Sequence, residues 1–405
     1  MSSLMKKIAI LGAGPAGIEA ASILANMDLD VQLYERSSSP LKNIADKAFL
    51  FPNFAPASDL VDAFSKKLLA EGITTHYDTN IVVVKHDGDG WCFEDEHGKT
   101  EYADAVLVAT GYTPFDAHRK EELGYGIYKG VVTSLEMEKM IRYQQIVNSL
   151  GEKPARITFL QCVGSRDEKI GNHYCSKVCC VTAVKQAIEV KKQLPDTEVY
   201  IYYMDLRMWG QHFEEMYREA QEKYGIRFIR GRISESSSTF DGRIQIKAED
   251  TLMGLPMKMS TDLLVLMVGM EASEGTRCIA KSLGLCGDYG FITTKDPHLN
   301  DNLTSQTDIY VAGSCKRPMS LNDVIMDARG AAYAIFEGLF TPEEKTTRLQ
   351  RLRGYLDGIR DNRQERREER QEEREERRGS RREQRQLRQD YREERRESKG
   401  KEERE

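Results

Sequence analysis

Short apolar runs alternate with amphipathic segments along the chain, and the first series predicts a strand, a helix and a second strand. Residues 6–11 form an apolar run that ends in glycines, residues 15–27 follow a helical pattern, and residues 30–34 form the next apolar run. Runs of this length in this order are typical of a βαβ unit, in which a helix joins two parallel strands. The start of the chain therefore predicts an α/β fold.

A hairpin and a buried strand follow this unit. Residues 81–85 and 91–94 alternate in polarity on either side of a turn at 86–90 that is rich in Asp and Gly, which predicts a β-hairpin. Residues 105–109 are all apolar, as expected of a strand buried on both faces.

A capped helix precedes a second βαβ unit. Thr133 and Glu136 have the spacing of a capping box, so we expect a helix from there to about Gly151. The strand–helix–strand pattern then restarts at residues 157–161, 182–193 and 198–204. The other expected elements are helices at 212–223 and 321–339 and extended segments at 227–230, 263–268 and 308–312. We therefore expect an α/β protein with two Rossmann-like three-layer domains.

The composition changes abruptly at about Arg360. From there to the end, Arg and Glu alternate and apolar residues nearly vanish. Such a segment cannot bury enough apolar surface to form a core, although its charge spacing allows many helical i,i+4 pairs. We expect a charged tail that is either disordered or a single solvated helix. It serves either as a solubilising tail or as a docking arm for a partner.

Charge and cysteine usage narrow the function classes. The formal net charge is −6, which gives no general basic field for nucleic acid. The longest apolar stretch, 263–270, is shorter than the ~20 residues that cross a bilayer. No signal peptide is recognisable before the first strand, and four of the eight cysteines crowd between positions 162 and 180. This pattern favours a cytoplasmic protein whose clustered thiols do metal or redox work.

The first strand and helix are joined by a glycine turn that is typical of dinucleotide binding. Gly12 permits a tight turn, Gly14 lets backbone amides approach a pyrophosphate, and Gly17 allows close helix–strand packing. Glu35, which ends the second strand, is placed to accept hydrogen bonds from a ribose. The expected dinucleotide contacts in this unit are Gly12, Gly14, Pro15, Ala16, Gly17, Glu35 and Arg36.

Two later segments favour FAD over NAD. Ala109, Thr110 and Gly111 resemble the Ala-Thr-Gly element of two-domain flavoproteins, and the segment 307–313, which ends in Gly313, resembles their second flavin segment. In such flavoproteins the FAD domain is split and a middle domain is inserted. We therefore add Ala109, Thr110, Gly111, Gly313 and Ser314 to the expected flavin contacts.

The second βαβ unit carries cysteines where a second glycine turn is expected. Cys162 follows its first strand, and Cys175, Cys179 and Cys180 precede or begin its helix. Four thiolates at this position suit an iron–sulfur cluster, a structural zinc or a redox disulfide. The spacing matches neither the ferredoxin run nor paired CxxC motifs, so the residues alone leave these alternatives open. Direct NADH binding here is disfavoured because the glycines are missing.

The cysteine segments resemble those of the flavoprotein subunit of the heterodisulfide reductases and its relatives. The resemblance rests on residues 162–167 and 174–180, with further matches at 123–126, 133–136, 205–207 and 228–232, and it covers roughly residues 5–340. The resemblance implies a thioredoxin-reductase-like arrangement, FAD, and a [4Fe–4S] cluster held by Cys162, Cys175, Cys179 and Cys180.

The chain also departs from this family. It has no ferredoxin-like CxxCxxC modules and no cysteine in residues 40–56. The expected function is therefore an electron-transfer subunit that passes electrons to iron–sulfur or disulfide-reducing subunits of a heterodisulfide-reductase-like complex, without electron bifurcation. The alternatives are a thiol–disulfide oxidoreductase that uses Cys175 with Cys179 or Cys180, and a non-enzymatic scaffold that recruits partners through its tail.

The same resemblance suggests a division of the chain. We expect a split FAD-binding domain at 1–130 and 271–345, an inserted domain with the cysteines at 131–270, and the tail at 346–405. A homodimer is possible in this arrangement. No acid–base or nucleophilic constellation stands out, so no catalytic residue is assigned.

Overall fold

The computed structural model describes residues 5–69, 72–88, 90–342 and 344–345. Contacts divide the chain into the units Met1–Thr341 and Pro342–Glu405, and the fold below belongs to the first. The predicted tail at 346–405 lies outside the described residues.

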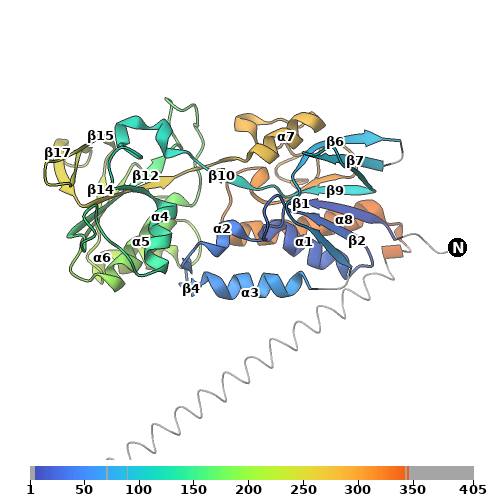
Figure 1. Ribbon diagram of the computed structural model, residues 1–405, viewed down its shortest axis with the longest axis horizontal. Coiled ribbons are helices and arrows are strands. Elements are labelled where there is room, and N and C mark those ends of the chain that lie inside the picture. The colour runs from blue at the N-terminus through green and yellow to red at the C-terminus, as the bar shows by residue number, and fades with distance from the viewer. Residues whose placement is uncertain (1–4, 70–71, 89, 343, 346–405) are drawn as a thin grey trace, which may run out of the picture. The chain divides into compact units, whose positions relative to one another are not determined.

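A five-stranded parallel sheet forms the core of the first part of the fold (Figure 1). Its order is β20-β9-β1-β2-β5, so the late strand β20 lies next to strands from the start of the chain. The strands are β1 (Lys7–Leu11), β2 (Asp30–Tyr34), β5 (Ile73–His76), β9 (Ala105–Val108) and β20 (Ile309–Val311). Helices α1 (Pro15–Ala25), α3 (Ala57–Lys67) and α8 (Leu321–Leu339) accompany this sheet, and α1 packs against α8. The predicted first βαβ unit is confirmed.

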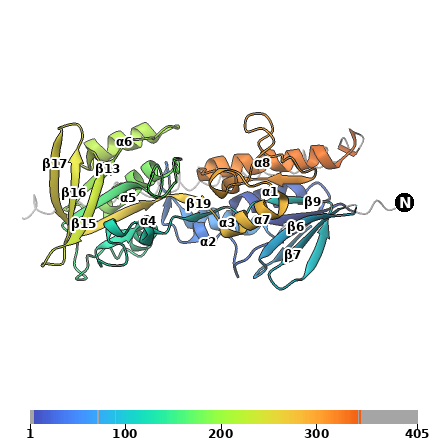
Figure 2. The same ribbon diagram turned by 90° about the horizontal axis from the view of Figure 1, so that it is seen from above.

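The predicted hairpin covers the other side of this sheet. It consists of β6 (Ile81–Asp87) and β7 (Gly90–Asp95), and a third antiparallel strand, β8 (Thr100–Ala103), extends it. Figure 2 shows β6 and β7 on one side of β1 and β9, with α8 on the other. Helix α7 (Glu274–Leu283) packs against β6.

A second five-stranded parallel sheet, in the order β11-β18-β12-β13-β14, confirms the second βαβ unit. The strands are β11 (Val131–Thr133), β12 (Arg156–Val163), β13 (Glu198–Tyr203), β14 (Arg227–Arg230) and β18 (Leu263–Val268). The helices that accompany it are α4 (Ser134–Arg142), α5 (Cys179–Gln193) and α6 (Phe213–Glu222). The capping box of Thr133 and Glu136 is present. Its helix, however, ends at Arg142 and not near Gly151, because Gln144 adopts a left-handed conformation at φ +54°.

Two smaller sheets were not expected from the sequence. The polar strands β15 (Ile233–Ser238), β16 (Ile244–Asp250) and β17 (Leu255–Thr261) form an antiparallel sheet. Strands β10 (Tyr112–Pro114) and β19 (Met270–Ala272) pair as an antiparallel ribbon where the chain passes between the two large sheets. Each ribbon strand is three residues long, too short to give a periodic signal.

The segment between β2 and α3 packs against the inserted part of the fold. It contains α2 (Lys42–Ala45), β3 (Phe49–Leu50) and β4 (Ala55–Pro56). Side chains Phe49, Phe51 and Phe54 contact the apolar core of the second sheet, and the Phe51 ring meets Phe213 of α6 edge to face at 5.7 Å. This segment therefore belongs in sequence to the first part but packs against the second.

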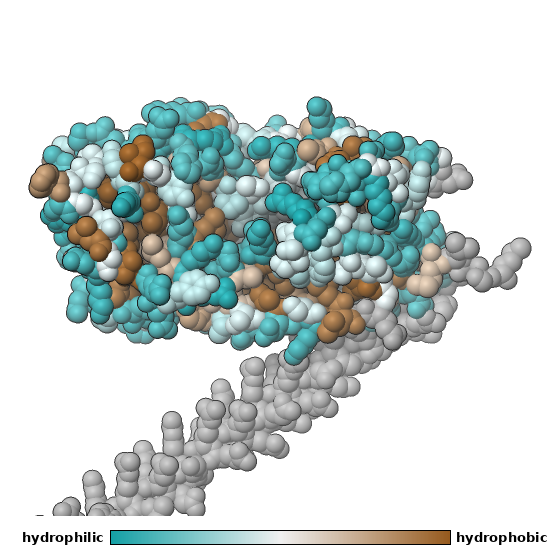
Figure 3. Space-filling view, in the orientation of Figure 1, coloured by the Kyte–Doolittle hydropathy of each residue, from teal (hydrophilic) through white to brown (hydrophobic). Residues whose placement is uncertain are grey.

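The strands of the first sheet lie before residue 109 or after residue 308, and those of the second lie between 131 and 268. The predicted domain limits stay a prediction. In the described part of the chain, no helix has the length and apolar character that a membrane span requires. Apolar side chains form several separate groups on the face drawn in Figure 3.

Candidate functional site

The glycine turn between β1 and α1 has the geometry that its sequence predicts. Gly12 adopts φ +112°, and a Cβ there would lie 2.5 Å from the carbonyl oxygen of Ala109. A Cβ at Gly17 would overlap the carbonyl oxygen of Gly12, which explains the close approach of helix and strand. At Gly14, by contrast, no protein atom lies within 4 Å of an added Cβ. The turn is thus crowded on the protein side and open at Gly14, where a pyrophosphate approaches in this type of unit.

Glu35 is held in place beside this turn. Its carboxylate accepts hydrogen bonds from the N–H of Ala13 at 2.8 Å and from the N–H and hydroxyl of Ser37 at 2.9 and 2.7 Å. These contacts fix the side chain at the edge of the cavity. Oε1 accepts both Ser37 hydrogen bonds, whereas Oε2 accepts only that of Ala13 and keeps a free lone pair for a ribose hydroxyl.

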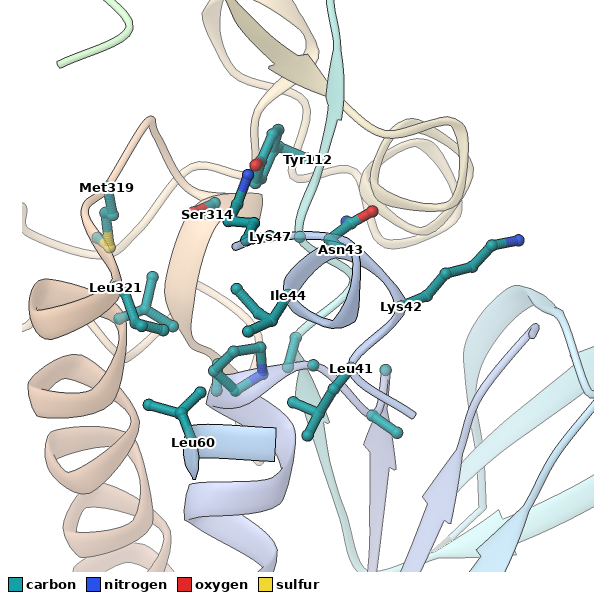
Figure 4. A pocket seen from close by; sticks show the side chains of 18 of the residues that line it. Leu41, Lys42, Asn43, Ile44, Lys47, Leu60, Tyr112, Ser314, Met319 and Leu321 are labelled. Atoms are coloured by element: carbon teal, nitrogen blue, oxygen red, sulfur yellow. The ribbon is translucent and has the colours of Figure 1, made fainter. Parts of the chain in front are cut away.

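A cavity of about 1250 Å³ opens from the glycine turn. It is larger than the ~300–1,000 Å³ of typical small-molecule sites, so an extended dinucleotide fits it. Figure 4 shows the apolar side chains around part of it, which belong to Leu41, Ile44, Leu60, Met319 just before α8 and Leu321 at its start. An apolar region of this kind suits a planar aromatic ring system.

Most of the predicted cofactor contacts line this cavity. They are Gly12, Gly14, Pro15, Ala16, Glu35, Arg36, Ala109, Thr110, Gly111 and Ser314. Gly17 and Gly313 do not line it. Gly17 lies behind the turn, and Gly313 supports Ser314, because its N–H donates to Asp327 at 2.6 Å.

Several lining residues were missed from the sequence. They come from the segment 41–60, from Asp78–Asn80 and from Tyr112, Met270 and Asn322. None of these residues belongs to a recognisable sequence motif. What they share is their position, just after the end of a strand or at the start of a helix.

The cysteine segments are held in a strained backbone. The pairing of β12 with β18 becomes irregular between Leu160 and Val163, which places a bulge at Cys162. Cys162, Arg166 and Lys177 all have positive φ, at +61°, +53° and +65°. Bulges and left-handed non-glycine residues concentrate at functional sites, where they re-aim side chains.

Buried hydrogen bonds tie the two segments together. The hydroxyls of Ser165 and Ser176 lie 2.7 Å apart, and Ser176 also accepts the N–H of Met270 at 2.8 Å. The side chain of Asn172 donates to the carbonyl oxygen of Gly164 at 2.9 Å. The loop that separates Cys162 from Cys175 is thereby fixed at both ends.

The four predicted ligand thiols lie near one another but do not all touch. Cys162 and Cys179 are within hydrogen-bonding reach. Cys180 lies 3.0 Å from the side-chain oxygen of Gln161, and the sulfur of Cys175 accepts the N–H of Lys177 at 3.3 Å. All four are free thiols.

The electrostatics of these thiols are uneven. The hydrogen bond from Cys179 and the positive charge of Arg166 lower the pKa of Cys162 to about 7. The same hydrogen bond and burial raise the pKa of Cys179, and burial raises the pKa of Cys180 to about 11. Of Cys162, Cys179 and Cys180, the first is therefore the most easily deprotonated.

The surroundings contain donors suited to thiolate-bound sulfur. Buried Gln161 Nε2 and Arg166 Nη1 have no hydrogen-bond partner within the described residues, and Cys180 Sγ accepts the N–H of Arg207 at 3.4 Å. Among the described residues, no three Cys, His, Asp or Glu side chains are arranged to hold a single metal ion.

The cysteine segment borders the cavity. Val178 and Thr182, which flank Cys179 and Cys180, are among the residues that line it. Lys177 forms a 2.6 Å ion pair with Asp323, in the first turn of α8. The start of α5 therefore lies beside the start of α8, and both contribute to the cavity wall.

The remaining cysteines do not line the cavity. Cys92 is a small core residue at 1% exposure. Cys315 is fully buried and bonds to the carbonyl oxygens of Val108 and Ala312, and burial raises its pKa to about 12. Ser314, and not Cys315, faces the cavity.

Comparisons with known proteins agree with the fold. Residues 2–142 match the family model for pyridine nucleotide-disulphide oxidoreductases. Thioredoxin reductases from Lactococcus lactis and T. acidophilum superpose with a TM-score of 0.58 at 18% identity, over 82% of this chain and 98% of theirs. The predicted thioredoxin-reductase-like arrangement is confirmed.

Sequence comparison identifies the proteins that this chain resembles more closely. Over 256 residues, or 62% of its length, the chain is 42% identical to the A subunit of the H2:CoB-CoM heterodisulfide,ferredoxin reductase of Methanothermobacter thermautotrophicus. The chain is similar to the A subunits of CoB–CoM heterodisulfide reductases. The iron-sulfur A subunit of the CoB–CoM heterodisulfide reductase of Methanocaldococcus jannaschii is also 42% identical, over 240 residues and 57% of this chain.

The matched region spans 38% and 36% of these relatives' own lengths. The resemblance to this family seen in the cysteine segments is confirmed. Together with the family model, it supports a flavin-type oxidoreductase.

Proposed function

We propose that this chain is an FAD- and [4Fe–4S]-containing electron-transfer oxidoreductase and one of the subunits of a heterodisulfide-reductase-like complex. One observation carries the proposal. The cavity lined by the glycine turn is also lined by Val178 and Thr182, beside Cys179 and Cys180 in the sequence. A dinucleotide bound at the turn would therefore extend towards the thiols.

FAD and a [4Fe–4S] cluster, when bound, supply the conversion between electron pairs and single electrons. The first turn of α1 presents free N–H groups to the pyrophosphate, and Glu35 accepts hydrogen bonds from the ribose. The apolar residues around the start of α8 would exclude water from the flavin ring system. We assign the cluster ligands to Cys162, Cys175, Cys179 and Cys180.

In this proposal the inserted domain would hold the iron–sulfur cluster, and the split domain would hold the FAD. Within the proposal, the domain limits are 1–130 and 271–345 for the FAD domain and 131–270 for the inserted domain. The ion pair of Lys177 with Asp323 joins them, so it keeps the cysteine segment at the cavity. The relatives are named as subunits, which supports partner subunits that receive the electrons.

A Cys175→Ser substitution tests this proposal in the full chain. Anaerobically purified variant should keep FAD but lose most of its iron and sulfide, because it lacks one of four ligands. Cys286→Ser is the matched control, since Cys286 is exposed and lies after α7. Iron and sulfide that are equal in both variants would refute the ligand assignment.

The contact between Cys162 and Cys179 favours a second candidate, a flavin-dependent thiol–disulfide oxidoreductase. Its pair differs from the predicted pairing of Cys175 with Cys179 or Cys180. This candidate predicts protein without iron, in which two thiols become titratable after anaerobic reduction. The scaffold hypothesis concerns the tail and stays a prediction.

A further inference from the structure

The loop after β13 forms a thin cover over one of the thiols. The carbonyl oxygen of Asp205 lies 3.7 Å from Cys180 Sγ, and the Arg207 N–H donates to the same sulfur at 3.4 Å. Cys180 is 4% exposed, whereas Arg207 and Trp209 in the covering loop are exposed, Trp209 at 63%. One layer of backbone thus separates this thiol from the solvent.

This cover carries an excess of positive charge. Arg166 forms a 2.7 Å ion pair with Asp205, and Arg230 lies 3.7 Å from the same carboxylate. Arg207 adds a third guanidinium beside it. The chain as a whole has a net charge of −6, so the excess is local. A patch of this kind attracts an acidic partner and speeds its encounter.

An exposed aromatic residue lies within this charged surface. The ammonium group of Lys177 lies 4.5 Å from the centre of the Trp209 ring, which holds the indole against the cysteine segment. Trp and Arg are the residue types that most often dominate the binding energy of protein interfaces. The combination favours a protein partner.

A nucleotide phosphate is the main rival occupant of these arginines. In a βαβ unit the pyrophosphate lies at the turn between the first strand and the helix. Here that turn is formed by the segments of Cys162 and Cys179, and Gly164 is packed tightly against the Phe115 ring. The thiol side chains take the place of the glycines, so the observations favour a protein.

We propose that Arg207, Trp209 and Arg230, the arginine–tryptophan face, form the docking site for an acidic one-electron carrier protein. The inference rests on the proposed function and names the partner's chemistry. The loop that carries Arg207 and Trp209 contacts Cys180 Sγ directly through its backbone. In each encounter one electron passes between this chain and the carrier protein, from whichever of the two is reduced to the one that is oxidised. No bond forms or breaks and no proton moves.

Binding to a defined probe tests this proposal. The probe is a purified small acidic ferredoxin, and the protein is the full-length chain prepared anaerobically. We expect Arg207→Glu, Arg230→Glu and Trp209→Ala each to raise Kd by about tenfold or more. Wild-type affinity should fall steeply between about 50 and about 500 mM NaCl. The control Arg243→Glu, next to β16, should change Kd by less than about twofold.

Cofactor content separates this test from that of the proposed function. Arg230→Glu and Trp209→Ala should keep wild-type iron, sulfide and flavin, because the structure places neither side chain on a thiol. A wild-type chain without iron would contradict the proposed function and still allow the binding test. The docking proposal is overturned if all three face variants bind the ferredoxin as wild type does. NADPH is the probe for the rival occupant, a nucleotide phosphate. The docking proposal is also overturned if the three variants lose NADPH binding while they keep wild-type affinity for the ferredoxin.

Discussion

Replacing Lys185 by Met should destabilise the protein strongly and locally. Lys185 of α5 and Glu138 of α4 form an ion pair in which both side chains are 3% exposed. Lys185 also donates to the carbonyl oxygen of Phe49 at 2.9 Å, and Glu138 accepts the N–H of Ala48 at 3.1 Å. The pair therefore fastens the segment before β3, which lines the cavity, to the inserted part.

The magnitude follows from the burial of the pair. Removing one partner of a buried ion pair leaves an uncompensated charge and costs about 3–5 kcal/mol. Adding Glu138→Gln to Lys185→Met removes that charge and keeps an oxygen that can accept the Ala48 N–H. The double variant should therefore recover about half of the loss, with a coupling energy of about 1–3 kcal/mol.

The effect should depend on pH. Burial alone would raise the pKa of Glu138, but the charge of Lys185 holds it below its usual value. Without Lys185, burial is opposed only by the charge of Lys47 and the hydrogen bond from Gln186, so the pKa of Glu138 rises in the variant. Glu138 then takes up a proton on folding, and the variant's deficit shrinks as the pH falls towards ~4.

Urea unfolding from neutral to acidic pH, together with hydrogen exchange of residues 45–56, measures these effects. Lys223→Met is the matched control, because Lys223 is 63% exposed in its ion pair with Glu219 and its replacement should leave the free energy of unfolding nearly unchanged. A loss below about 1 kcal/mol for Lys185→Met, independent of pH, would refute the reasoning.

Three further predictions follow from individual contacts. Gly14→Val should lower FAD affinity at least about tenfold without lowering the Tm of the cofactor-free protein, since no protein atom lies within 4 Å of an added Cβ and the backbone there is extended. At a second position, burial raises the pKa of Glu101, but hydrogen bonds from Lys99 and Tyr34 outweigh burial and lower this pKa to about 2. Tyr34→Phe should cost about 1.5 kcal/mol in urea unfolding at neutral pH, and this loss should fade as the pH falls from 4.5 towards 2. Thr133→Ala removes the cap of α4 and should cost about 1 kcal/mol in the same assay, whereas an unchanged midpoint would contradict the capping role.

The local motifs were predictable from the sequence because they depend on neighbours in the chain. The glycine turn and the capping box of Thr133 each lie within a few residues, so their patterns sufficed. The bounds of α8 were likewise predicted, since Ser320 caps its first turn and its apolar residues repeat with helical spacing.

Distant pairings could not be predicted in this way. Strand β10 forms only because Tyr112 meets Ala272, far away in the sequence. Lys185 lies in a helix where a lysine normally indicates a solvent-facing position, and only the position of Glu138 explains its burial. The missed cavity residues, such as Ile44 and Leu60, become site residues only because their segment folds over the glycine turn.

The placement of the cysteines was predictable only in part. Their clustering in sequence put them at the first turn of α5, as the structure has it. The contact of Cys162 with Cys179 depends on the bulge in β12, for which the sequence has no clear signal.

The proposed function requires that one chain hold both a flavin and an iron–sulfur cluster. The most direct measurement is anaerobic purification of the full chain with FAD, iron and sulfide quantified in the same sample. The account predicts about one FAD, about four iron and about four sulfide per chain. Flavin without iron and sulfide would contradict it.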